Sequence, residues 1–108
     1  MRVLVDLDVT PPSVALADPA DCARFHVEVH GGDADDAGAL DAALRAHGAG
    51  SAVGATGADI AVDAVRRMAS EGVGPSWEDD FSAMLSYART KGWLSDDGAL
   101  IRAHVERG

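Results

Sequence analysis

Three segments of the chain alternate between apolar and polar residues, and this period of two most constrains how the chain can fold. They are residues 2–9, 24–30 and 99–106. Because successive side chains of a strand point to opposite faces, each segment predicts a β-strand with one buried face. The chain is therefore expected to begin and end in strands of a sheet.

The region between these strands carries helical patterns, of which residues 76–91 form the clearest. An apolar stripe with the spacing of a helix runs through Trp77, Phe81, Met84, Leu85 and Ala88. Ser76 is suited to the N-cap with Asp79 three residues later, and Gly92 is suited to end the helix.

Shorter helices are predicted around residues 36–47, capped by Asp35 or Asp36, and around 63–71. Asp18 and Pro19 predict one helical turn over about 19–23. Residues 58–62 predict a short strand or, alternatively, the first part of a single helix that begins at Asp59.

Four glycines stand between residues 48 and 57, where Val53 is the one large side chain. This composition predicts a flexible loop. Together the patterns predict one α+β domain over residues 1–108, with a three- to four-stranded sheet packed against two or three helices.

The hydrophobic core is expected to be small. Leu, Ile, Val and Phe account for only 23 of the 108 residues, whereas alanine alone contributes 21. We therefore expect the largest apolar side chains to supply most of its bulk, namely Phe25, Met68, Trp77, Phe81, Met84 and Trp93.

The chain is acidic, with 18 Asp and Glu against 9 Lys and Arg and a net charge of −9. Such a field repels phosphate groups, which argues against nucleic-acid or membrane partners. A solvated surface that keeps the protein soluble explains the charge, and the alternative is a docking face for a basic partner protein. No basic segment followed by an apolar run opens the sequence, so a cytoplasmic protein without a signal peptide is expected. An edge strand of the sheet could also pair with that of a second copy and form a homodimer.

One cluster has the residue types of a metal site, His26-x-Glu28-x-His30. Imidazole and carboxylate bind divalent transition metals such as zinc. On a strand the three side chains share a face, but each i to i+2 step spans about 6.5–7 Å, so one ion can reach only an adjacent pair. A further ligand must come from elsewhere, and His104 is a candidate on the last predicted strand. The alternative is a polar strand face with no ion, paired across strands with residues 102–106.

Nucleophilic catalysis finds little support in the sequence. Cys22 stands beside Asp21, and a neighbouring carboxylate raises the pKa of a thiol, so a small, buried and unreactive cysteine is expected. No serine lies in a Gly-x-Ser-x-Gly elbow. With a single cysteine, the chain also has no internal disulfide.

The stretch from Trp77 to Leu94, with Phe81, Met84-Leu85, Tyr87-Ala88 and Lys91-Gly92-Trp93-Leu94, resembles that of small acidic proteins of GC-rich bacteria. Those proteins have no assigned activity. The resemblance implies a bacterial origin and no catalytic residue.

These observations favour a non-enzymatic accessory or regulatory protein that binds another protein, through a flank at Tyr87 or the polar face of strand 24–30. A metal-binding protein or small metalloenzyme using His26, Glu28, His30 and His104 is the first alternative. The second is a small-molecule-binding domain closed by the 48–57 loop.

Overall fold

The computed structural model describes residues 1–22, 24–32, 37–54, 56–69 and 73–107. Within these ranges the chain forms six strands and three helices. In chain order they are β1 (Arg2–Asp6), β2 (Ser13–Ala17), β3 (His26–His30), α1 (Ala37–Ala46), β4 (Gly50–Val53), β5 (Gly57–Ala61), α2 (Val62–Ala69), α3 (Trp77–Thr90) and β6 (Leu100–Arg107).

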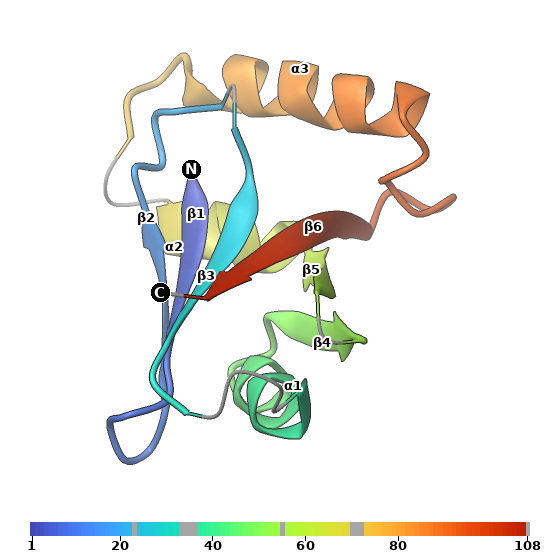
Figure 1. Ribbon diagram of the computed structural model, residues 1–108. Helices are drawn as coiled ribbons and strands as arrows, with labels where there is room; N and C mark the ends of the chain where they lie inside the picture. The colour runs from blue at the N-terminus through green and yellow to red at the C-terminus, as the bar shows by residue number, and fades with distance from the viewer. Residues whose placement is uncertain (23, 33–36, 55, 70–72, 108) are drawn as a thin grey trace.

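The strands form one mixed sheet in the order β2-β1-β3-β6-β5-β4 (Figure 1). β3 lies at its centre and runs parallel to both β1 and β6, whereas the remaining pairs are antiparallel. The first and last strands of the chain therefore flank the same central strand.

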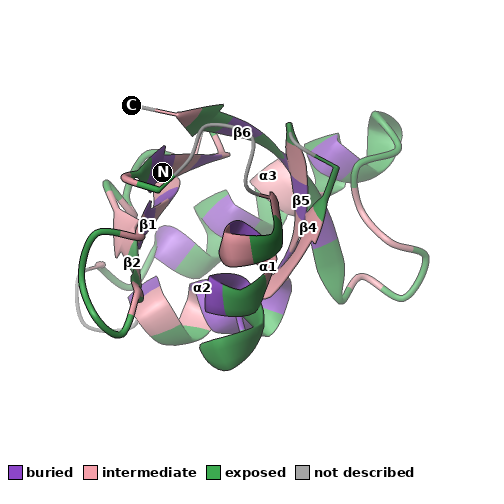
Figure 2. Ribbon diagram, turned by 60° about the horizontal axis from the view of Figure 1, so that its bottom comes forward, coloured by how far each residue is buried: buried purple, intermediate pink, exposed green. Residues whose placement is uncertain are grey.

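The sheet curls around α1 and α2, which lie on its concave side (Figure 2). α3 crosses one end of the sheet, beside the segment that leads into β3 (Figure 1). Alternate residues of β1, β3, β5 and β6 point into the concave side and build the core with Leu40, Leu44, Val65 and Phe81. None of the described helices combines the length and apolar character needed to cross a bilayer.

The predicted α+β class is confirmed, but the predicted strand number is wrong, since the sheet has six strands rather than three or four. The two strands that the sequence pattern did not reveal are β2 and β4. Both are short and consist largely of alanine, serine and glycine. β2 has two large side chains, Val14 and Leu16, and β4 has one, Val53, so neither strand is long enough to give a clear periodic pattern.

β4 lies within the segment predicted as a glycine-rich loop. Gly50 has φ 146°, and a Cβ at this position would lie 2.0 Å from the Asp59 carbonyl oxygen. Glycine at position 50 thus allows β4 and β5 to approach closely, rather than conferring freedom on a loop.

The predicted helical turn at 19–23 is also wrong over its described part. Residues 19–22 contain no helix, and the Asp21 amide donates to the Asp18 carbonyl as in a β-turn. Residue 23 and the proposed caps Asp35 and Asp36 lie outside the described residues.

The best-specified helix, α3, is confirmed with its predicted bounds nearly unchanged. Ser76 precedes it, but its side chain makes no capping hydrogen bond. Gly92, with φ 77°, ends the helix.

Candidate functional site

The convex face of the sheet carries a polar surface, because the helices α1 and α2 occupy the concave side (Figures 1 and 2). Valines of β1 and β3 point inward and are buried, and the alternate residues point outward. In β3 the outward residues are His26, Glu28 and His30, as the sequence predicted. In β6 they include Arg102, His104 and Glu106.

The last strand lies beside β3, which is the arrangement that the alternative of a shared polar face required, and its register places like residues side by side. His26 of β3 lies opposite His104 of β6, and Glu28 lies opposite Glu106. Since β3 and β6 are parallel neighbours, these four residues occupy adjacent positions on the convex face. We call them the His–Glu square.

The carboxylate of Glu28 is engaged within β3 and toward β1. Its Oε2 accepts a hydrogen bond from His30 Nε2 at 2.7 Å and lies 3.6 Å from Arg2 Nε. The hydrogen bond from His30 is the main cause that lowers the pKa of Glu28, and the nearby Arg2 charge adds to it. Glu28 is therefore an ionised acceptor that holds its neighbours in place.

The other carboxylate of the square faces a different histidine. Glu106 Oε2 lies 3.6 Å from His26 Nε2, and the Glu106 side chain is 58% exposed. His30 and His26 thus have separate carboxylate partners. As the side chains stand, no three His, Cys, Asp or Glu of the described ranges surround a common point. A metal site built from His26, Glu28, His30 and His104 stays a prediction.

Next to the square, the end of α3 presents two aromatic rings. The Gly92 amide donates to the Arg89 carbonyl and the Trp93 amide to the Ala88 carbonyl, the paired bonds of a Schellman motif. This reversal sends Trp93 back against Tyr87, with the ring centroids 6.0 Å apart in an edge-to-face contact. Their exposed fractions are 47% for Trp93 and 56% for Tyr87.

The prediction that Trp93 belongs to the core is therefore wrong. Trp77 and Phe81 are buried as predicted, whereas Phe25, Met68 and Met84 pack at the edge of the core. One feature of the sequence could have indicated that Trp93 is exposed: it directly follows a helix-ending glycine and precedes a polar turn. A pattern of spacing alone gives no direction for a side chain placed there.

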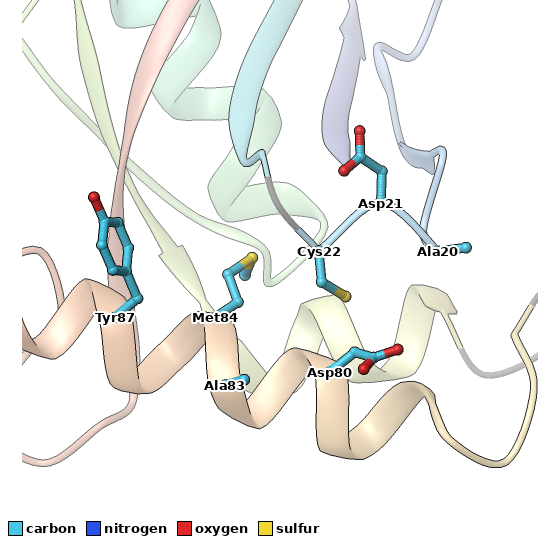
Figure 3. A pocket seen from close by; sticks show the side chains of 7 residues that line it. All are labelled: Ala20, Asp21, Cys22, Asp80, Ala83, Met84 and Tyr87. Atoms are coloured by element: carbon cyan, nitrogen blue, oxygen red, sulfur yellow. The ribbon is translucent and has the colours of Figure 1, made fainter.

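Three adjacent hollows run along this part of the surface and share walls. The largest, of about 620 Å³, lies between α3 and residues 20–22 (Figure 3). A second hollow shares Met84 and Tyr87 with the first. A third hollow, of about 330 Å³, shares Phe25 and Trp93 with the second and reaches His104. We call this series the α3 groove.

Charge is concentrated at the end of the α3 groove where the helix begins. Asp79 and Asp80 are exposed and make no ion pair within the described part of the chain, and Asp80 lines the largest hollow. Asp21 lines the same hollow, but its carboxylate points away from α3 (Figure 3) and lies 3.9 Å from the terminal ammonium of Met1.

The thiol of Cys22 also lines the largest hollow. Burial raises its pKa, and the negative charge of Asp80 raises it further, so the thiol stays protonated at neutral pH. The raised pKa agrees with the prediction of an unreactive thiol, but Cys22 is partly buried rather than buried as expected. The hollow therefore offers binding contacts rather than a nucleophile.

Comparison with known proteins gives no match to any family model, curated protein or solved structure. The resemblance of residues 77–94 to small acidic bacterial proteins stays a prediction.

Proposed function

We propose that this protein is a non-enzymatic accessory or regulatory protein that binds another protein through the α3 groove. The observation that carries the proposal is the exposed pair Tyr87 and Trp93, which stands where the hollows of the groove meet. Tryptophan and tyrosine are the side chains most enriched among residues that dominate binding energy at protein interfaces.

Several contacts hold the pair in this arrangement. Trp93 is fixed by the backbone bonds that end α3, and the Lys91 ammonium lies 5.5 Å from the Tyr87 ring centroid. Rings that are already ordered lose little conformational entropy when a partner covers them, so more of the buried area contributes to affinity.

The charge of the groove supports a basic partner. Asp79 and Asp80 lie in the first turn of α3, and the whole chain carries a net charge of −9. A Lys- or Arg-rich segment of the partner, lying along the groove, would meet carboxylates at one end and aromatic rings further along. Association between such surfaces is faster and tighter at low ionic strength.

The test compares three immobilised proteins in the capture of partners from an extract of the source cells. They are the wild type, the double variant Tyr87→Ala/Trp93→Ala, and Val9→Ala. Val9 is 43% exposed and lies far from α3 in the sequence, so it controls for the general loss of an exposed apolar side chain. The proposal requires a protein that the wild type and Val9→Ala retain and the double variant releases.

The dissociation constant of that protein, once purified, is then measured at two salt concentrations. We expect the double variant to weaken binding by about 1000-fold, since two such residues each contribute about 2 kcal/mol and each 1.4 kcal/mol is tenfold in affinity. We expect high salt to weaken the wild-type complex as well. Equal retention of the partner by the double variant would overturn the proposed groove. An affinity that does not change with salt would overturn the proposed basic partner.

A further inference from the structure

The His–Glu square adjoins the α3 groove, which His104 also lines, and has its own chemistry. His26 and His104 stand opposite each other on neighbouring parallel strands, and Glu106 follows His104 two residues later on the same strand. Neighbouring strands are about 4.8 Å apart, and residues i and i+2 about 6.5–7 Å. Two imidazoles and one carboxylate therefore project from one small triangle of the convex face.

The hydrogen bonds of the square decide which carboxylate is available. Glu28 Oε2 accepts a hydrogen bond from His30 Nε2 at 2.7 Å and forms an ion pair with Arg2, whose Nε lies 3.6 Å away. Glu106 has only His26 as an ion-pair partner within the described ranges, and it is largely exposed. A cation would therefore meet Glu106 without displacing an existing hydrogen bond.

The separation of His26 and Glu106 suits a shared metal ion. Their Nε2 and Oε2 atoms are 3.6 Å apart, which is longer than an N–H···O hydrogen bond. In a tetrahedral zinc site with bonds of 2.0–2.1 Å, two neighbouring ligand atoms lie about 3.3–3.4 Å apart. A shift of a few tenths of an ångström would place both atoms on one ion.

The third ligand requires a side-chain rotation. His104 borders the hollow beside Phe25 and Trp93 and makes no hydrogen bond or ion pair within the described part of the chain. Turning an exposed imidazole from one staggered rotamer to another breaks no interaction there. The backbone register already places it next to His26.

The arginines that flank the square do not oppose a cation. Arg2 pairs with Asp18 as well as Glu28, and Arg102 donates to Asp59. Each positive charge is thus offset by a carboxylate of its own.

We propose that His26, His104 and Glu106 together bind one divalent transition-metal ion, with zinc as the best match to two imidazoles and a carboxylate. The remaining coordination position would be open to water, since His104 and Glu106 are exposed. The site differs from the one expected from the sequence in two respects: Glu106 takes the place of Glu28 as the carboxylate ligand, and His30 is not a ligand.

The experiment titrates zinc into the untagged, chelator-treated full chain and records binding by calorimetry. The wild type should bind one ion per chain. Loss of an outer-shell partner alone costs about 10- to 100-fold in metal affinity, so His26→Ala and His104→Ala should each cost about 100-fold or more. Glu106→Gln should weaken binding by at least about tenfold.

His47→Ala is the matched control and should bind zinc within about twofold of the wild type. His30→Ala, which releases the Glu28 carboxylate, should not weaken binding. Circular dichroism of every variant establishes that the fold is kept. A wild type with no affinity tighter than about 1 mM would overturn the proposal. So would undiminished binding by folded His104→Ala, or a loss in His30→Ala as large as that in His26→Ala. Because none of these measurements involves Tyr87 or Trp93, they are independent of the proposed protein partner.

Discussion

The two tryptophans stand at opposite ends of α3 and have opposite environments. Trp77 opens the helix, is 7% exposed, stacks on Phe81 with ring centroids 4.7 Å apart, and donates from Nε1 to the Pro19 carbonyl at 2.6 Å. Trp93 follows the helix and is 47% exposed. The first joins α3 to the rest of the molecule, and the second is presented to solvent.

This difference shows that residue type does not determine the role of a large aromatic side chain in a small domain. The two residues stand at the two ends of the same helix, and the sequence predicted both as core residues. What separates them is the backbone on either side: Trp77 lies within the first helical turn, whereas Trp93 follows a residue in the left-handed conformation. We expect stability to depend on one end of α3 and binding on the other.

The largest predicted effect is that of removing the buried ring. Trp77→Ala should lower the free energy of unfolding by about 3–5 kcal/mol, since it leaves a cavity against Phe81 and the Pro19 carbonyl without its donor. Trp93→Ala should lower it by about 1 kcal/mol or less, as is usual for exposed positions. Urea denaturation of both variants measures the contrast, and equal losses would show that Trp93 is a core residue after all.

The same contrast explains how far the sequence could predict the fold. Strands β1, β3 and β6 and helix α3 were predictable because large side chains such as Val3, Val27 and Phe81 mark a buried face at regular spacing. The strands made of small residues were not, because Ala15 or Gly50 fits equally well in a strand or a loop. The order of the strands was not predictable either, since it depends on contacts between distant segments.

The candidate site was predictable in its residue types and only partly in its geometry. Period two in residues 26–30 placed three polar side chains on one face, and the alternation of the last strand did the same for His104 and Glu106. Their partners depend on register between β3 and β6, which no local pattern encodes. The sequence therefore indicated the histidines but could not indicate that Glu106, rather than Glu28, faces His26.

A smaller effect is predicted at the residue that orients Trp93. Gly92 has φ 77°, and a Cβ there would meet no atom within 4 Å. Gly92→Ala should therefore cost only the conformational penalty of a left-handed alanine, about 1–2 kcal/mol in the free energy of unfolding. Thermal unfolding and the fluorescence of Trp93 in a Trp77→Phe background measure the loss and any displacement of the ring.

Gly74→Ala is the matched control for this substitution. Its added Cβ would also meet no atom within 4 Å, but Gly74 is not among the glycines with positive φ. We expect this variant to be as stable as the wild type or slightly more stable, because alanine restricts the unfolded chain. If both variants lost the same stability, the left-handed conformation of Gly92 would not be the cause.

The smallest predicted effect is a pH dependence confined to the Trp93 end of α3. Asp97 accepts hydrogen bonds from the Ser95 hydroxyl at 2.7 Å and the Ala99 amide at 3.0 Å, and these bonds lower its pKa. These hydrogen bonds hold the turn that follows Trp93. The Trp93 carbonyl in turn accepts a hydrogen bond from the Arg102 amide. The ionised carboxylate thus stabilises the segment that carries the exposed ring.

The sign follows from the direction of the shift. A carboxyl whose pKa is lower in the folded protein contributes stability above its unfolded pKa, near 3.9, and this contribution is lost as the pH falls through the folded value. Acidification below about pH 4 should therefore alter the fluorescence of Trp93, measured in Trp77→Phe, before that of Trp77, measured in Trp93→Phe. Asp97→Asn should remove this difference in pH response. If the fluorescence of both tryptophans changed at the same pH while Asp97 was present, α3 would unfold as one unit with the segment that follows it. The two ends of the helix would then not be separable.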